Sequence, residues 1–429
     1  MKKELETYPT GKIPPREDAS PVRNDKNRKK LGTKAKFFTG FTLISSILGV
    51  AYTQKDQYTD DLANFSRSVI GDNNTARLEK YYFYLEDQKN KLVYEITGDK
   101  KSSFDKDFEV SITYSQSVNP GELNLPDNEP ALGEPSAVVE PSTPAPLILP
   151  EIQYLGVPLA EGEGIWRTDD LPRTSPEDPL MVKTVVRPDE SRPYAKVNIL
   201  LLDKRRIRLN MVGGTKSPGE TSGVSGPGRI PAEDRQNLLV AFNGGFQGNH
   251  AEWGMYANEK TYKSLVNGFA SVAVTSEGEI LMGEWGRTLE WRDDMVAVRQ
   301  NAALLVENCE VSDRTLENNK TWGYIVYLQQ DNVTRRSAIG LTQNGDLLVA
   351  TGDNVKPDTL ARALWAAGAC TAMQLDINTP QVNTSLYFQR DDGSVKGEFF
   401  GGTEDPDRFL RTQEYDFMYA TLDERNYIP

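Results

Sequence analysis

The sequence predicts an α+β fold with a mixed or largely antiparallel sheet and packed helices, preceded by an N-terminal membrane helix, a helical stalk and a Pro-rich linker. Three observations predict it: one long apolar stretch near the N-terminus, a Pro-rich run that ends at residue 150, and short apolar runs separated by turn residues after it. With 429 residues, the chain is long enough for two or three domains.

The apolar stretch is predicted to be a membrane anchor at residues 37–53. Residues 37–52 carry no charge, and their length is at the short end for a helix that spans a bilayer. Residues 1–36 hold eleven Lys or Arg against five Asp or Glu, and acidic residues follow the stretch. This bias predicts a single-pass protein with a cytoplasmic basic tail (1–36) and an extracytoplasmic C-terminal part. A cleaved signal peptide and a buried core helix remain alternatives.

Two segments are expected between the anchor and the main domain. Residues 54–116 are predicted to form a juxtamembrane helical segment, because apolar residues recur at near-helical spacing over 77–96. This segment either packs on itself or on a partner, or is a solvated stalk. Residues 117–150 contain eight prolines from Pro120 onward and are predicted to be an extended linker that acts as a spacer.

Residues 151–429 are predicted to form the globular domain. Strands are expected at 197–202, 207–212, 238–242, 271–275, 280–285, 337–342, 347–351 and 371–375. Asn344-Gly345 predicts a type I′ hairpin turn, because both central residues of that turn need a positive φ. One helix is expected at 359–367, with Asp358 as its N-cap and Gly368 at the C′ position.

Composition excludes several classes of function. The net charge of −13 argues against a nucleic-acid partner. The single histidine, His250, rules out His-pair zinc sites and two-histidine acid/base schemes. Two cysteines, Cys309 and Cys370, are too few for a cysteine metal cluster. They either form one disulfide or stay buried and apart.

Two motifs at predicted strand ends could carry chemistry. Asn243-Gly244-Gly245 follows an apolar strand, and paired glycines can expose backbone N–H groups that suit an anion. Asp376 ends another apolar strand, where its carboxylate would be held rigidly at the rim of the sheet. From the residues alone, a plain turn and a capping Asp are the alternatives.

Two further positions are candidates. Arg336 enters an apolar strand and could grip a phosphate or carboxylate with its guanidinium, or lie on an exposed edge strand. His250 lies close to Glu252 and Trp253, which could make a general acid/base or a sugar-stacking corner, or a structural histidine.

Together these motifs resemble the phosphodiester glycosidase family over about residues 195–390. The family's usual strings are NGGFF, RTAIG and LDGGGS. Asn243-Gly-Gly-Phe246 and Arg336-Ser-Ala-Ile-Gly340 nearly match the first two. The third departs, because Ile377-Asn378-Thr379 stands where the family has glycines. The segments 161–166 and 187–193 look like those of a bacterial membrane-anchored subgroup.

The resemblance implies an extracytoplasmic hydrolase that cleaves the glycosidic C–O bond next to phosphate in a sugar 1-phosphodiester of envelope or exopolysaccharide glycans. The expected partners are this glycan or sugar-phosphate substrate and the membrane. A non-catalytic protein of glycan binding or envelope assembly is the alternative. No cofactor is required by the sequence; a divalent cation could bind Asp376, but no set of metal ligands is indicated. Nothing in the sequence indicates an oligomeric state.

Each candidate residue then has an expected role. The catalytic residues are Asp376 as base or nucleophile, Asn243 to orient the substrate and His250 as a donor. The substrate or phosphate would be bound by Arg336, Gly244, Gly245, Asn378 and Glu252.

Overall fold

The computed structural model describes residues 68–69, 71–97, 146–157, 162–249, 252–317, 322, 333–378, 381–402 and 405–423. The predicted anchor at 37–53 and most of the predicted linker lie outside these residues. No helix within the described ranges is long and apolar enough to cross a membrane.

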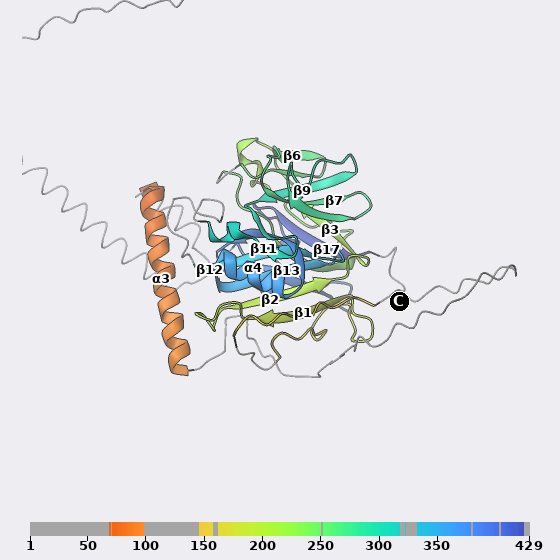
Figure 1. Cartoon of the computed structure of the whole chain (residues 1–429). Helices are drawn as coiled ribbons and strands as arrows, with labels where there is room; N and C mark the ends of the chain where they lie inside the picture. Colours follow the sequence, from red (N-terminus) through yellow and green to blue (C-terminus); the bar gives the residue numbers. More distant parts are fainter. Residues whose placement is uncertain are drawn as a thin grey trace, which may run out of the picture. The chain divides into compact units, whose positions relative to one another are not determined.

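Within the described ranges the strands form three sheets, in which all neighbouring strands run antiparallel (Figure 1). The first sheet has the order β1 (Met181–Val186), β2 (Lys196–Leu202), β13 (Leu347–Val355), β12 (Thr334–Thr342), β14 (Ala369–Ile377), β10 (Leu304–Glu307), β11 (Glu310–Val311). The second has the order β16 (Val395–Gly401), β15 (Thr384–Gln389), β4 (Leu238–Asn243), β17 (Phe417–Leu422), β3 (Ile207–Val212). The third has the order β6 (Lys260–Lys263), β5 (Met255–Ala257), β9 (Met295–Asn301), β7 (Ala270–Thr275), β8 (Ile280–Glu284).

Helical structure is sparse in the described residues. The two α-helices described over several turns are α3 (Asp72–Thr97) and α4 (Pro357–Ala366). Short 3₁₀ turns are η1 (Gly219–Thr221), η2 (Arg235–Asn237), η3 (Asp313–Leu316) and η5 (Arg408–Leu410). The prediction of a largely antiparallel sheet is therefore confirmed. Of the packed helices that the sequence predicts for the domain, the described residues after 146 contain one α-helix, α4.

The first sheet is buried on both faces. On β2, Leu200 and Leu202 point into a core shared with the second and third sheets. Their neighbours Ile199 and Leu201 point into a second core that contains Leu360 of α4. Successive strand residues face opposite sides, so a strand buried on both sides reads as a continuous apolar run. The run KVNILLL of β2 has this character.

Helix α4 forms nearly where the sequence predicts it, but with a different N-terminus. Lys356, not Asp358, is the N-cap, and Pro357 takes the first helical position, where its fixed φ suits a helix start. Thr359 Oγ1 accepts a hydrogen bond from the Lys356 N–H at 2.8 Å. At the other end Gly368 has a φ of 89° and donates its N–H to Trp365 O, as a C′ glycine should.

The hairpin between β12 and β13 differs from its predicted turn. Gly345 has a φ of 85°, but Asn344 is not among the described residues with positive φ, so the turn is not type I′. Gly345 donates to Thr342 O at 2.9 Å, and Thr342 donates to Asp346 O at 3.0 Å. This pattern is that of a three-residue loop closed by a glycine bulge.

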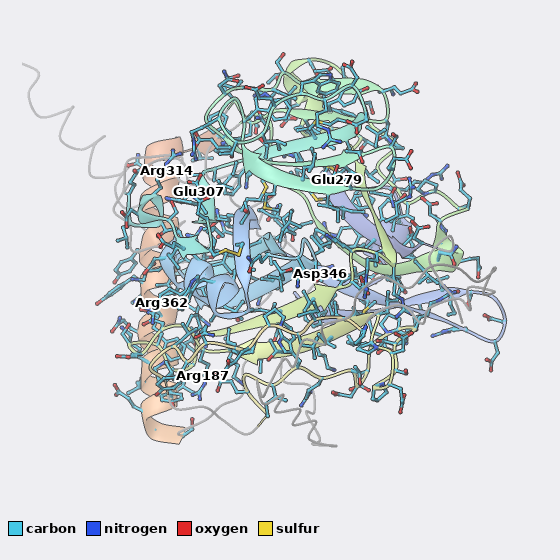
Figure 2. All side chains as sticks on the ribbon, turned by 45° about the vertical axis from the view of Figure 1, so that its right-hand side comes forward. Arg187, Glu279, Glu307, Arg314, Asp346 and Arg362 are labelled. Carbon is cyan, nitrogen blue, oxygen red and sulfur yellow. A yellow bond between two sulfur atoms is a disulfide. The ribbon has the colours of Figure 1, made fainter. Side chains whose placement is uncertain are left out.

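The packed domain begins before residue 151. Leu147 is buried in the α4 core, and Trp166 Nε1 donates to Pro150 O at 2.7 Å. Arg362 of α4, labelled in Figure 2, donates to Leu155 O at 3.1 Å. The last residues of the predicted linker therefore belong to the domain.

The two cysteines form a disulfide. Cys309, in the turn between β10 and β11, is bonded to Cys370 of β14 (Figure 2). Of the two arrangements that the sequence left open, the structure has the bridge.

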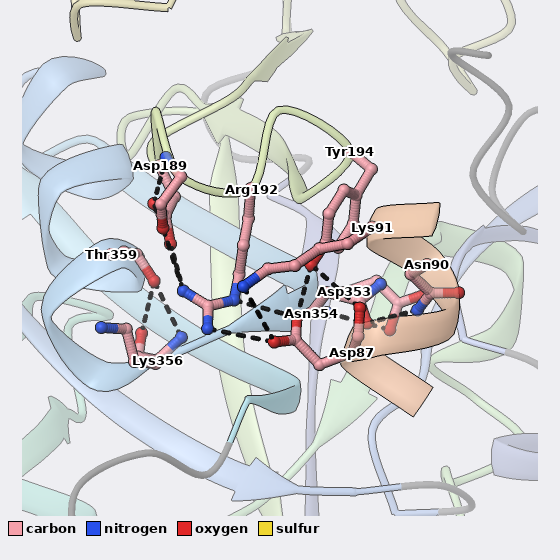
Figure 3. Close-up of polar contacts among 11 residues, drawn as sticks. Asp87, Asn90, Lys91, Asp189, Arg192, Tyr194, Asp353, Asn354, Lys356 and Thr359 are labelled. Carbon is pink, nitrogen blue, oxygen red and sulfur yellow. Dashed lines mark hydrogen bonds and ion pairs between the residues drawn. The ribbon is translucent and has the colours of Figure 1, made fainter. Parts of the chain in front are cut away.

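Helix α3 packs against the domain along one face (Figure 3). The carboxylate of Asp87 is 4% exposed and receives two parallel hydrogen bonds from Arg192, at 3.0 and 3.1 Å. Tyr194 donates its hydroxyl to the same carboxylate. One turn further on, Asn90 Nδ2 donates to Asn354 Oδ1 at 2.9 Å. A planar guanidinium fork on a carboxylate gives both strength and a defined orientation.

These contacts decide the protonation of Asp87. Burial alone would raise the pKa of its carboxyl group, but hydrogen bonds from Arg192 and Tyr194 and the charge of Arg192 outweigh burial. The pKa of Asp87 therefore lies below its ordinary value. A carboxyl group with a lowered pKa stabilises the docked state above its ordinary pKa, and this stabilisation is lost as the pH falls through the lowered value.

We expect Asp87→Asn to loosen α3 at pH 7, because the amide keeps the volume but loses the charged fork. The docked helix should lose about 1–3 kcal/mol. Hydrogen-exchange protection factors over residues 72–97 should fall, while those of β12 and β14 stay unchanged. In the wild type the same protection should fade below pH ~4. Glu95→Gln, on an exposed position of α3, is the matched control; equal protection in Asp87→Asn and wild type would contradict the docking role.

Candidate functional site

Strand ends from the first two sheets surround a small cavity of about 20 Å³. That volume holds about one water molecule. β4 ends at Asn243, β14 ends just after Asp376, and β17 begins just after Asp416. The residues that line the cavity are Asn243, Gly244, Asp376, Gln381, Arg408, Phe409, Gln413, Tyr415 and Asp416. Three of the residues singled out from the sequence, Asn243, Gly244 and Asp376, thus come together.

The glycine pair is required by close packing. Gly244 donates its N–H to Asp416 O at 3.0 Å and accepts at its own carbonyl from the Asp376 N–H at 3.0 Å. A Cβ on Gly244 would lie 2.0 Å from Asp416 Oδ2, and one on Gly245 would lie 2.8 Å from Arg299 Cζ. Gly245 donates to Asp416 Oδ2 at 3.2 Å. The two N–H groups expected to bind a phosphate are therefore both engaged by Asp416.

Asn243 connects three strands with its side chain. Its Nδ2 donates to Gly244 O at 3.0 Å and to Ser337 Oγ at 2.8 Å. Its Oδ1 accepts from the Asn383 N–H at 3.1 Å. Ser337 in turn donates to Asp376 O at 2.9 Å. Asn243 therefore holds the cavity wall in place, and its polar atoms are taken up by the protein itself.

A β-bulge turns Asp376 toward the cavity. Ala338 of β12 pairs with Gln374, but Arg336 pairs with Ile377, so β14 has one extra residue over this stretch. Such a bulge re-aims the side chains beside it. Asp376 is 8% exposed, and its Oδ1 accepts the Ile377 N–H at 2.8 Å. The carboxylate is thus held at the cavity by the backbone of its own strand end.

Arg336 lies in a different place from the one expected. Its guanidinium is fully buried and donates to Val355 O at 3.2 Å, Trp322 O at 3.1 Å and Gln374 Oε1 at 2.9 Å. Neighbouring strand residues face opposite sides of a sheet, so Ser337 reaches Asn243 while Arg336 points the other way. Arg336 is not among the residues that line the cavity.

The remaining predicted residues are not brought to the cavity. His250 lies outside the described residues. Glu252 has a 78% exposed side chain, and its carboxylate lies 4.0 Å from Lys263 Nζ. Asn378 accepts a hydrogen bond from Thr334 Oγ1 at 2.7 Å. It has a φ of 68°, a conformation that glycine favours and that asparagine tolerates better than most residues.

A buried ion pair that the sequence analysis missed lies behind the cavity. Arg299 of β9 is 0% exposed, and its Nε and Nη2 contact the two oxygens of Asp416 at 2.8 and 3.1 Å. Its other donors reach Phe246 O and Gln300 O, each at 2.7 Å. A charged residue inside the apolar strand sequence MVAVRQN was the available signal, because a buried Arg needs a partner.

Arg408 is the second missed residue. It lies in η5 and is the one cation among the cavity's lining residues. Its Nε donates to Gln413 Oε1 at 3.2 Å, and Gln413 Nε2 donates back to Arg408 O at 2.6 Å. The sequence around it, DPDRFLRT, is polar and carries no pattern that would single out this arginine.

A metal site is not indicated by the described residues. No group of three or more His, Cys, Asp or Glu among them is placed to hold a metal ion. The charge of Asp416 is engaged by Arg299, and Asp376 is the other carboxylate that lines the cavity.

We expect Arg299→Gln to destabilise the domain by about 3–5 kcal/mol, because it leaves the buried Asp416 carboxylate without its cation. Denaturant unfolding of the variant checks this. Arg292→Gln is the control, since Arg292 makes comparable ion pairs with Asp294 and Glu279 on the surface. The control should lose far less stability; equal losses would show that burial of the Arg299 pair is not what matters.

The comparisons with known proteins address the same region. The family model described as phosphodiester glycosidase matches residues 236–376. This stretch runs from η2 to Asp376 and includes Asn243, both glycines and Arg336. A search of curated proteins finds no match.

Similar solved structures are remote. The catalytic domain of zebrafish N-acetylglucosamine-1-phosphodiester alpha-N-acetylglucosaminidase, auto-inhibited by its propeptide, is 14% identical, with 59% of this chain and 87% of that chain covered and a TM-score of 0.39. A hypothetical protein from Synechocystis is 13% identical, with coverages of 57% and 62% and a TM-score of 0.31. A putative exported protein from Burkholderia pseudomallei is 12% identical, with coverages of 53% and 74% and a TM-score of 0.22. At these TM-scores we conclude nothing from the three structures.

The match of the family model confirms the resemblance that the three motifs predicted. Residues 236–376 of this chain match the model of that family.

Proposed function

We propose that the C-terminal domain hydrolyses a sugar 1-phosphodiester by breaking the glycosidic C–O bond next to the phosphate. The observation that carries this proposal is Asp376, a carboxylate held at a cavity between strand ends, inside the segment that matches the phosphodiester glycosidase family.

The chemistry needs few groups. The leaving phosphate is a weak base, so it needs its charge neutralised more than it needs a proton. One of the two carboxyl groups of an ordinary glycosidase can then be dispensed with. Asp376 would act either as the base that activates water or as the nucleophile at the anomeric carbon. Asp416 is a poor candidate for a second role, because Arg299 engages both of its oxygens.

The size of the cavity supports the reading of Asp376 as a base. A volume of about 20 Å³ admits one water but not a sugar ring. The sugar would lie across the mouth of the cavity, and the water beside Asp376 would attack it. Asn243 and Ser337 would keep the strand ends in register during the reaction.

A non-catalytic protein that binds glycans during envelope or exopolysaccharide assembly is the second candidate. It is favoured by Ile377-Asn378-Thr379, which replaces the family's glycines after the aspartate. Against it, Asn378 keeps a left-handed backbone at this turn, as a glycine would. Release of free sugar from a chromogenic sugar 1-phosphodiester supports the enzyme, and tight glycan binding without turnover supports the second candidate.

We place the domain outside the cytoplasm, anchored by residues 37–53, with envelope or exopolysaccharide glycans as its substrate class. The charge bias around that segment supports this topology. The Cys309–Cys370 disulfide supports it independently, because such bonds persist mainly in oxidising compartments.

We expect Asp376→Asn to abolish most turnover of the phosphodiester, since the amide keeps the volume but cannot act as base or nucleophile. A loss of about 10²-fold or more in kcat is the scale for a general base. Melting temperature should change little. Asp358→Asn, in the first turn of α4 away from the cavity, is the matched control. Wild-type turnover by folded Asp376→Asn protein would end the catalytic assignment.

Protease added to intact cells should cut the chain after residue 117, which a denaturing gel would show as a domain fragment separated from its anchor segment. A cytoplasmic marker protein, uncut in the same cells, is the control for leakage. If the domain is cut only after the cells are lysed, the proposed topology is wrong.

A further inference from the structure

One positively charged residue lines the cavity and has no role in the hydrolysis proposed above. Arg408 lines the same cavity as Asp376, with Gln413 and Tyr415 beside it. An anionic leaving group needs a cation, and the sequence analysis assigned that task to Arg336. The structure offers three arginines near these strand ends, and their surroundings differ.

Two of the three arginines are engaged in the interior. Arg299 is 0% exposed and grips Asp416 with two hydrogen bonds. Arg336 is also 0% exposed, and its Nε and Nη1 donate to two backbone carbonyls and to Gln374. Moving either guanidinium to a ligand would leave buried carbonyl or carboxylate groups without donors, which costs about 1–3 kcal/mol for each group.

Arg408 differs because it is only half-buried and lines the cavity. The local backbone fixes where it stands: Arg408 donates its N–H to Asp405 O at 3.0 Å, and Phe409 is buried against Phe417 with ring centroids 5.0 Å apart. Gln413 Oε1 accepts a hydrogen bond from Nε of the Arg408 guanidinium. The backbone of Arg408 is therefore anchored beside the cavity that this residue lines.

The charges around the cavity are arranged for a substrate of mixed polarity. Besides Asp416, which pairs with Arg299, the charged residues that line the cavity are Asp376 and Arg408, of opposite sign. A sugar 1-phosphodiester develops positive charge at its anomeric carbon and negative charge on the departing phosphate. A carboxylate suits the first and a guanidinium, with its planar fork, suits the second.

We propose that Arg408 binds the phosphate of the substrate and thereby selects phosphodiesters over neutral glycosides. The assignment rests on the proposed function for the nature of the substrate. The binding of an anion at Arg408 is a separate property that can be measured without turnover.

The first experiment measures binding of inorganic phosphate to the full chain by calorimetry. Arg408→Gln should weaken phosphate binding by about tenfold to a hundredfold, the range for a hydrogen bond to a charged group. Arg408→Lys should recover part of it, because the charge returns without the fork. Arg411→Gln is the matched control: Arg411 lies three residues on, is 64% exposed and pairs with Asp405 outside the lining. Its phosphate affinity should equal that of the wild type.

The second experiment separates this inference from the proposed function. With a chromogenic sugar 1-phosphodiester, Arg408→Gln should raise KM and lower kcat/KM, while a neutral aryl glycoside is turned over as by the wild type. Phosphate binding that depends on Arg408, in a protein that turns over neither substrate, would sink the proposed hydrolase and leave the anion site standing. Phosphodiester turnover and phosphate affinity that are both unchanged in Arg408→Gln would overturn the assignment of Arg408 and leave the hydrolase standing. Failure of the wild type to bind phosphate would also overturn it.

Discussion

The buried pair of Arg299 and Asp416 is the constraint on which the candidate site depends. Arg299 belongs to β9 of the third sheet, and Asp416 directly precedes β17 of the second. Neither group has appreciable exposure, so each charge is tolerable only because the other is in contact. The pair fixes the start of β17, and Asp416 then receives the N–H groups of Gly244 and Gly245 through its carbonyl and carboxylate. These contacts hold the turn after β4 against the start of β17.

A chain of polar contacts continues from the turn after β4 to the first sheet. Asn301 of β9 accepts the Phe246 N–H and donates to Gln374 O and Leu375 O of β14. On the other side, Asn243 holds Ser337, which holds the carbonyl of Asp376. Asn301 thus holds the β14 backbone directly before Asp376, and Asn243, through Ser337, holds it at Asp376. Buried polar networks of this kind, when satisfied, favour a single arrangement of the strands around them.

The regular parts of the fold could be predicted from the sequence because they follow from local patterns: continuous apolar runs bounded by turn residues, and a glycine after a helix. The apolar runs of β2, β4 and β14 lie close to their predicted positions, and Gly368 ends α4 as expected. The irregular parts could not. The bulge that aims Asp376 depends on the pairing of β12 with β14, which a single strand does not encode. Arg336 illustrates the same limit: its motif was recognised, but which side of β12 faces α4 is decided by packing between sheets. Arg408 lies in a polar stretch and becomes notable only where the chain folds back on the cavity.

The chain before the domain contacts the domain at two places, and this limits how far the domain can lie from the residues that precede α3. α3 is bound to the domain through Asp87, and the chain is bound to it again at Leu147. The 48 residues from 98 to 145 therefore begin and end on the same body. Adding prolines to that stretch would enlarge a closed loop and would not move the domain away from whatever precedes Asp72. In the anchored arrangement proposed above, the 18 residues from 54 to 71, and not the Pro-rich run, would set the distance between the cavity and the membrane and so determine which glycans come within range.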